Sequence, residues 1–326
     1  MELVMLNPNL SAEVVKKIED CRGPIERFVN DKSIAEKIVK LLQIRDEISH
    51  LIMDRTDTSL EDVAESEAKK ILQTVLLPLQ YPERFKGFLS PQKSILLVGA
   101  QGSQKVMLAK AAANASSAKL FNIPSSVILS KNAEGSADFI KVLFQMAKHA
   151  QPSVIFIDEI DILSQRWMKR QAKAQFLVEM DRLSSKSGDF GVFVIGATDR
   201  PQEMDEDASG RFAKRIFVEM PDKKAREKML WKIVKNNEND FELSEKEIDQ
   251  LALMTENFSF DDLLELCQTA NLAIVHNASE QNKFFHGAMD AQFCRIKMKD
   301  LENAIEEKQK PKRKQSNGKE KESQIV

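Results

Sequence analysis

The segment SILLVGAQGSQKV, residues 94–106, combines residue types that bind phosphate: an apolar stretch, glycines, a lysine and the start of a helical pattern. Gly99 and Gly102 allow backbone N–H groups to turn toward phosphate oxygens, and Lys105 supplies a positive charge for the outer phosphates. A helix that begins beside the lysine adds the positive end of its dipole. The pattern predicts a P-loop for ATP or ADP, whose residues are Gly99, Ala100, Gln101, Gly102, Ser103, Gln104, Lys105, Val106 and Met107.

Two residues depart from the P-loop pattern GxxxxGK[ST]. Gln104 stands where the pattern has glycine, so its side chain would crowd the approach of the backbone to the phosphates. Val106 stands where the pattern has serine or threonine, and it has no hydroxyl to bind Mg²⁺. A damaged nucleotide site is one interpretation, and a coincidental strand–turn–helix crossover is the alternative.

The acidic segment SVIFIDE, residues 153–159, favours the nucleotide site. Asp158 and Glu159 follow an apolar stretch that is typical of a buried strand. Two carboxylates at the end of a parallel strand can hold a Mg²⁺ shell and polarise an attacking water. Asp158 is therefore the predicted metal ligand and Glu159 the predicted catalytic partner, whereas an acidic pair that only caps the next helix is the alternative.

Short apolar stretches alternate with helical patterns between residues 94 and 198. Such strands, apolar on both faces, predict an α/β fold with a mostly parallel sheet sandwiched by helices. The predicted strands are 95–99, 119–123, 153–158 and 191–197, and the predicted helices lie near 105–115, 136–150 and 168–183. Residues 11–55 are also predicted to be helical, and the segment after Lys223 contains only helical patterns.

The composition excludes several classes of protein. The formal net charge is −2, which argues against a dedicated nucleic-acid-binding protein. The three cysteines, Cys21, Cys267 and Cys294, form no CxxC pair, so neither a zinc site nor a disulfide framework is expected. No basic-then-apolar signal and no stretch long enough to cross a bilayer is present. We therefore expect a cytoplasmic protein, with the nucleus as the alternative.

Three longer segments carry a resemblance to a known family. Together they resemble the AAA family of ATPases, and within it the microtubule-severing group of spastin, katanin and fidgetin, which is related to the Vps4 ATPase. The segments are EDVAESEAKKILQTVLLPLQYPERFKGFLSPQKSILLVGAQGSQKVMLAKAAA, LFQMAKHAQPSVIFIDEID and VIGATDRPQEMDEDASGRFAKRIFVEMPD. The resemblance implies an α/β nucleotide-binding domain, a small helical lid and hexameric rings with ATP between subunits.

Several positions depart from the motifs of that family. Asp199 of GATDRP stands where the family has asparagine, so an acceptor replaces an amide donor beside the phosphates. Arg211 follows Gly210 where the family has two adjacent arginines that reach the neighbouring subunit's site. In the segment SKNAEG, Asn132 and Ala133 replace the aromatic residue and glycine of the loop that grips substrate in the central pore.

Other parts of the machinery also differ from the family. The second pore loop is shortened between Ser164 and Phe176, and TENFSF replaces the glycine-containing turn of the lid. The basic residues Lys169, Arg170 and Lys173 are an alternative contact for an acidic partner, although a solvated helix face is the simpler interpretation.

The resemblance, combined with the helical patterns, divides the chain into four parts. They are an N-terminal helical segment (1–55), an AAA-type nucleotide-binding domain (56–222), an all-helical lid (223–308) and a disordered polar tail (309–326). The leading hypothesis is an AAA subunit with weak or lost hydrolysis that regulates or scaffolds other AAA subunits. The alternatives are an active ATPase that remodels microtubules or protein complexes, and a nucleotide-independent module for an acidic partner.

Overall fold

The computed structural model describes residues 32–54, 58–60, 63, 77, 81, 84, 93–164, 170–185, 191–237, 240–280 and 295–319. They divide into two compact units, the first ending at Val218 and the second beginning at Glu219. The loop residues Gln101–Ser103 group with the second unit. The division falls close to the predicted start of the lid.

A six-stranded sheet forms the centre of the first unit, in the order β1-β3-β4-β5-β2-β6. All neighbouring strands are parallel except β1, which pairs antiparallel with β3. The strands are β1 (Ile52–Met53), β2 (Ser94–Val98), β3 (Lys119–Ile123), β4 (Ser153–Ile157), β5 (Val192–Thr198) and β6 (Lys214–Phe217). The central strands β2, β4 and β5 are buried along their whole length, as expected for a sheet covered on both faces.

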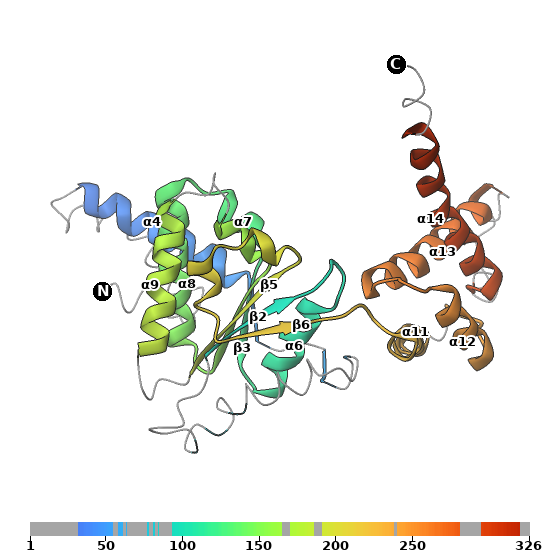
Figure 1. Cartoon of the computed structure of the whole chain (residues 1–326), viewed down its shortest axis with the longest axis horizontal. Helices are drawn as coiled ribbons and strands as arrows, with labels where there is room; N and C mark the ends of the chain where they lie inside the picture. Colours follow the sequence, from blue (N-terminus) through green and yellow to red (C-terminus); the bar gives the residue numbers. More distant parts are fainter. Residues whose placement is uncertain are drawn as a thin grey trace. The chain divides into compact units, whose positions relative to one another are not determined.

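Helices cover the two faces of the sheet and form two apolar cores. On one face, α8 and α9 lie side by side, and α4 packs against α8 (Figure 1). On the other face, α6 packs against β3 and β4. The helices of this unit are α4 (Lys32–Ser49), α6 (Lys105–Ala115), α7 (Ser125–Leu129), α8 (Ala133–His149), α9 (Arg170–Ser185) and α10 (Glu206–Ser209).

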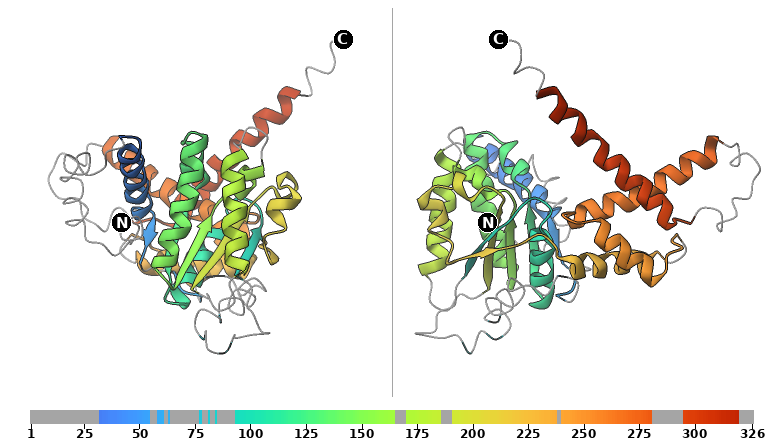
Figure 2. Two further views of the ribbon diagram at one scale, coloured as in Figure 1. Left: turned by 90° about the vertical axis from the view of Figure 1, so that its left-hand side faces the viewer. Right: turned by 45° about the vertical axis from the view of Figure 1, so that its right-hand side comes forward.

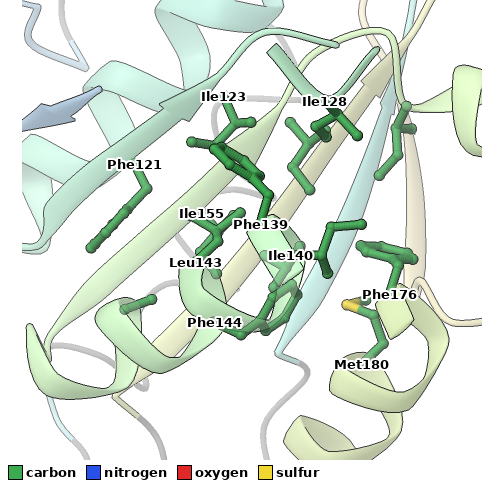
Figure 3. Packing of buried hydrophobic residues seen from close by; sticks show 14 of the residues in the cluster. Phe121, Ile123, Ile128, Phe139, Ile140, Leu143, Phe144, Ile155, Phe176 and Met180 are labelled. Atoms are coloured by element: carbon green, nitrogen blue, oxygen red, sulfur yellow. The ribbon is translucent and has the colours of Figure 1, made fainter. Parts of the chain in front are cut away.

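Alternation along each strand assigns its side chains to the two cores. Leu96 of β2 belongs to the core under α8 and α9, whereas Leu97 belongs to the core under α6. Large aromatic residues fill the first core, where Phe144 and Phe176 meet edge to face with ring centroids 6.2 Å apart (Figure 3). This packing fixes the strand ends that carry the polar residues of the site.

The second unit is entirely helical in its described residues, apart from one isolated β-bridge between Phe241 and Ile296 (Figure 2). Its helices are α11 (Lys223–Asn236), α12 (Glu245–Met254), α13 (Phe260–Glu280) and α14 (Met298–Lys319). Buried leucine and isoleucine side chains from all four helices form its core. Arg226 is buried and donates to the carbonyl oxygens of Pro221 and Ala252, which ties α11 to the end of α12.

The structure confirms the predicted fold class, an α/β sheet sandwiched by helices and followed by a helical unit. It differs from the sequence predictions in three places. Residues 52–53 form β1 rather than the end of a helix, because Ile52 and Met53 pair with β3. The edge strand β6 was not predicted. Helix α14 ends at Lys319, beyond the predicted end of the lid at residue 308.

Some predictions lie outside the described residues. They include the helical patterns of residues 11–31, most of the segment from 56 to 92, and the tail from residue 320 onward. Across the described helices, none combines the length and the apolar character that crossing a bilayer requires.

Candidate nucleotide-binding site

The predicted site residues follow three strands whose carboxyl ends meet at one edge of the sheet. Val98, the last residue of β2, is paired in register with Thr198, the last residue of β5. Ile157 of β4 is paired with Gly196 of β5. The loop after β2, Asp158 after β4 and Asp199 after β5 therefore emerge at the same edge, where ligands bind in open α/β sheets.

The loop between β2 and α6 has the backbone of a phosphate-binding turn. Its first N–H, that of Gly99, donates to the carbonyl of Thr198 at 3.1 Å. Gly102 has φ 76°, a conformation that glycine adopts without strain. The helix α6 begins at Lys105, and no side chain caps its first turn. The N–H groups of a helix's first turn have no partner within the helix and attract anions.

Gln104 adopts a left-handed backbone, with φ 65° and ψ 13°. This conformation costs a residue with a Cβ about 1–2 kcal/mol, so the position favours the glycine of the P-loop pattern. The side chain is 9% exposed, and its amide nitrogen Nε2 is buried without a hydrogen-bond partner. Gln104 therefore introduces both backbone strain and an unsatisfied polar group into the loop.

Lys105 lies inside the loop rather than extending from it. Its Nζ donates to the carbonyl oxygens of Gly99 at 2.7 Å and Ala100 at 2.8 Å. Burial lowers the pKa of Lys105, while the nearby carboxylates of Asp158 and Asp199 act to raise it. The structure thus brings these three predicted site residues within electrostatic range of one another.

The residues that follow the lysine face the protein. The side chain of Val106 is partly buried against the core under α6. Its methyl groups offer nothing that can bind a cation, and Met107 is likewise half-buried. Within the described residues, no three histidine, cysteine or acidic side chains are grouped closely enough to hold a metal ion. The residues present therefore fit a phosphate group, and Asp158 is the carboxylate that could hold Mg²⁺ without a hydroxyl from Val106.

The acidic pair after β4 is held by local and long-range hydrogen bonds. Burial raises the pKa of Asp158, and its Oδ1 accepts a hydrogen bond from the N–H of Glu159 at 3.0 Å. Glu159 has φ 51°, and its Oε2 accepts from the hydroxyl of Ser125 at 2.5 Å. Sequence reasoning missed Ser125, which follows β3 and lies 34 positions from its partner. Its place at the carboxyl end of a neighbouring strand was the available signal.

Asp199 is not isolated at the edge of the sheet, because it is paired with the next residue. The Nε of Arg200 lies 3.3 Å from Oδ1 of Asp199. Arg200 also contacts Asp161, a fully buried carboxylate that follows β4. Sequence reasoning missed both residues, although they stand within the quoted segments SVIFIDEID and GATDRP.

Arg211 lies at the opposite end of β2 from the loop. Its carbonyl oxygen accepts from Ser94, the first residue of β2, whereas the loop follows the last residue. Its guanidinium pairs with the carboxylate of Asp181 on α9, with Nε 2.7 Å from Oδ1. Arg211 is therefore not part of the site that this chain builds around Lys105.

Residues of two segments that were predicted to contact partners form hydrogen bonds or ion pairs with residues of the same chain. Asn132 caps α8, and its Oδ1 accepts from the N–H of Gly135 at 2.7 Å. The neighbouring Lys131 forms an ion pair with Glu47 of α4. In the predicted basic cluster, Lys173 is paired with Asp205 and Arg170 is exposed, while Lys169 lies outside the described residues.

The fold and the site define a P-loop nucleotide-binding domain with a helical lid. The family model of the ATPase family associated with various cellular activities (AAA) matches residues 95–220. Spastin of Danio rerio is 38% identical over 251 residues, which are 74% of this chain and 43% of that protein. The spastin homolog of Caenorhabditis elegans is 37% identical over 273 residues, which are 80% and 53% of the two chains.

Solved structures agree with the sequence relatives. The AAA domain of FIGL-1 in complex with ADP superposes with a TM-score of 0.71 at 28% identity, covering 80% of this chain and 88% of that chain. A katanin chain, from a study of katanin self-assembly, gives a TM-score of 0.68 at 33% identity, covering 81% and 90%. This chain belongs to the AAA family, in the group of spastin, katanin and fidgetin-like proteins. It spans about half the length of the curated relatives it matches.

Proposed function

We propose that this chain is an AAA subunit that binds adenine nucleotide weakly, hydrolyses it slowly or not at all, and regulates or scaffolds active AAA subunits. The observation that carries the proposal is Gln104, which stands in a left-handed conformation with a buried, unsatisfied amide in the phosphate loop. A side chain at this position takes up space that a glycine leaves open for the approach of the phosphates to the backbone. This crowding lowers affinity relative to a glycine loop.

Two other positions lack groups that would bind Mg²⁺ or promote hydrolysis. Val106 supplies no hydroxyl for Mg²⁺, and it packs against the core instead. Asp199 supplies an acceptor where a donor would stabilise the charge of the reacting phosphate. Glu159, the predicted catalytic carboxylate, is hydrogen-bonded to Ser125. These features support weak binding of the nucleotide and little turnover.

The proposed role with other subunits rests on family membership and on the altered loops. The FIGL-1 relative is an ADP complex, and the katanin relative comes from a study of self-assembly. We propose by analogy that this chain assembles with AAA subunits, including those that act on microtubules. Asn132 is an exposed helix cap and supplies no aromatic ring to grip a polypeptide. A binding role therefore fits this loop better than a pulling role.

One observation favours an active ATPase as the second candidate. Lys105, Asp158 and Glu159 are all present, and Lys105 lies within electrostatic range of Asp158. If these three groups are sufficient, the exchange Glu159→Gln abolishes hydrolysis and leaves nucleotide binding intact.

Nucleotide binding and turnover measured on one preparation decide between the candidates. The binding assay is titration of ADP and ATP, with and without Mg²⁺, by calorimetry. We expect dissociation constants that change little on addition of Mg²⁺, and turnover far below about 1 s⁻¹, the low end for ordinary enzymes. Turnover near that value that is lost in the Glu159→Gln variant would contradict the proposal and establish the active ATPase.

A further inference from the structure

The guanidinium of Arg200 stands among three carboxylates. Its Nε lies 3.3 Å from Oδ1 of Asp199, its Nη2 lies 3.3 Å from Oδ2 of Asp161, and its Nη1 lies 3.5 Å from Oε2 of Glu203. The charge of Asp161 is the first cause that raises the pKa of Arg200, followed by the hydrogen bond to Asp199. The guanidinium thus remains charged and compensates part of a negative cluster.

Arg200 is anchored to the end of the central strand by both its backbone and its side chain. Its N–H donates to the hydroxyl of Thr198 at 3.0 Å, and that hydroxyl donates to Oδ1 of Asp161 at 2.7 Å. Thr198 and Asp161 are both completely buried. Since Thr198 is in register with Val98, this network has a fixed position relative to the start of the phosphate loop.

Asp199 directly follows Thr198 of this network and lies within electrostatic range of Lys105 in the phosphate loop. Its charge acts on both Lys105 and Asp158. An uncompensated carboxylate at this place would repel the phosphates of a nucleotide, although solvent screens part of the repulsion because the Asp199 side chain is 36% exposed. Among the ion pairs of the described residues, Arg200 is the cation that contacts Asp199 directly.

We propose that Arg200 is a positioning residue that holds the Asp199 carboxylate and neutralises it, so that the damaged site still admits an anionic nucleotide. The inference rests on the proposed nucleotide binding. It deepens that function by explaining how the site tolerates an acidic residue where the family has an amide. The role is electrostatic and acts through Asp199, so it disappears when Asp199 carries no charge.

A double-mutant cycle on the full chain tests the proposal, with ADP as the probe. We expect Arg200→Gln to weaken ADP binding by about fivefold, because both side chains of the pair are partly exposed and solvent screens their charges. The same exchange in an Asp199→Asn background should change the affinity less than about twofold, because the carboxylate through which Arg200 acts on the site is absent while Asp161 and Glu203 are the same in both backgrounds. Arg200→Lys, which keeps the charge and loses the planar fork, should fall between wild type and Arg200→Gln.

A general structural role of Arg200 gives a different result. It would weaken ADP binding equally in both backgrounds, and that outcome overturns the proposal. Arg182→Gln is the matched control for the loss of one guanidinium. Arg182 lies on α9 and pairs with Glu179 of the same helix. The next residue, Leu183, accepts a hydrogen bond through its carbonyl oxygen from the side chain of Lys93, which directly precedes β2. It therefore lies at the opposite end of the strands, and we expect no change in ADP affinity.

Urea unfolding without nucleotide separates this proposal from the proposed function. It is measured on the four proteins of the cycle: the wild type, Arg200→Gln, Asp199→Asn and the variant with both exchanges. Non-additive effects of the two exchanges on the unfolding free energy support the Arg200–Asp199 link. Additive effects overturn it. Failure of the wild-type chain to bind millimolar ADP overturns the proposed function, whatever the unfolding cycle gives.

Discussion

Arg211 forms a two-point ion pair with Asp181 of its own chain, with Nε 2.7 Å from Oδ1 and Nη2 3.3 Å from Oδ2. The hydrogen bond to Asp181 is the first cause that raises the pKa of Arg211, and the charge of Asp181 is the second. In the family that this chain belongs to, the resemblance assigns the corresponding arginines to the neighbouring subunit's site. The pair with Asp181 holds the guanidinium of Arg211 on its own chain.

Release of Arg211 should therefore be detectable in a neighbour. We predict that Asp181→Asn increases ATP turnover in a mixture with an active katanin or spastin AAA domain, relative to the wild-type chain in the same mixture. The increase should be at most about fivefold, since both side chains of the pair are exposed and such a pair contributes about 0.2–1 kcal/mol. Steady-state phosphate release at fixed total protein is the measurement.

Two further variants control this experiment. Asp207→Asn removes another nearby carboxylate and leaves the Arg211–Asp181 pair intact, so it should behave like the wild type. Arg211→Gln combined with Asp181→Asn should cancel the gain. A gain that persists without Arg211 would show that Asp181 acts in some other way.

The exchange of Gln104 for glycine should increase both the stability of the fold and the affinity for ADP. Gln104→Gly removes a left-handed strain of about 1–2 kcal/mol, from which the larger unfolded-state entropy of glycine subtracts about 0.5–1 kcal/mol. We expect a net stabilisation of about 0.5–1 kcal/mol in urea unfolding. We also expect ADP to bind at least about fivefold more tightly, because the buried amide no longer occupies the loop.

Ser117→Gly is the matched control for the backbone effect. Ser117 is exposed and has φ 50°, and it follows the carboxyl end of α6, whereas Gln104 precedes its amino end. It should give a similar gain of stability without any change in ADP affinity. Equal effects of both exchanges on ADP binding would mean that general stability, rather than the space in the loop, controls the affinity.

The sequence was sufficient to predict the four parallel strands β2, β3, β4 and β5 and the polar residues that follow β2, β4 and β5. The strands β2, β3, β4 and β5 are short apolar stretches, and the phosphate loop and Asp158 occur at positions that the P-loop pattern specifies. The strand β6 was missed because it is short, with Lys214, Arg215 and Phe217 exposed. Its pairing partner, rather than its composition, makes it a strand.

The partners of the site residues were not predictable in the same way. Ser125 and Glu159 are 34 positions apart, and Asp181 and Arg211 are 30 positions apart. No local periodicity encodes such contacts, since they depend on how neighbouring strands and helices are placed in the fold. The pairing of Asp199 with Arg200 is local, but its meaning depends on the buried Asp161, which only the structure identifies.

The aromatic core under α8 and α9 predicts a large loss of stability on truncation. Phe176 is completely buried beside Phe144, with ring centroids 6.2 Å apart (Figure 3). It also contacts Phe212, whose ring centroid is 6.3 Å away. Phe176→Ala should cost about 3–5 kcal/mol in the unfolding free energy. Phe217→Ala is the control, because that ring is 72% exposed, and its effect should stay within about 0.5 kcal/mol. Similar losses in the two variants would contradict the assigned core.

The helical unit contains an ion-pair cluster that predicts how its stability depends on pH. Lys308 of α14 lies 2.6 Å from both Asp262 and Glu265 of α13. Burial acts to raise the pKa of Asp262, but hydrogen bonds from Lys308 and Ser259 outweigh it and lower the pKa to about 2. The Asp262 carboxylate therefore favours the folded state when it is ionised.

Because the folded pKa lies below the unfolded value of about 3.9, the stabilisation is present above pH 4 and is lost as the pH falls toward 2. The side chain of Asp262 is 35% exposed, so solvent screening reduces the contribution to about 1 kcal/mol. Burial acts to lower the pKa of Lys308, but the two carboxylates raise it overall. The stabilisation of the folded unit by Lys308 is thus complete below the unfolded pKa of about 10.5 and is lost as the pH rises above it.

We predict that Lys308→Met removes most of both pH dependences and leaves the folded unit intact, since its methylene stem is retained. The probe is the fluorescence of Trp231 on α11 in urea unfolding at pH 2, 4, 7 and 11, with Trp167→Phe as the common background. Lys297→Met is the matched control, because that exposed lysine pairs only loosely with Glu242 at 3.6 Å. It should leave the pH profile of the wild type unchanged. A wild-type profile in the Lys308→Met variant would show instead that the capping hydroxyl of Ser259 lowers the pKa of Asp262 without help from the lysine.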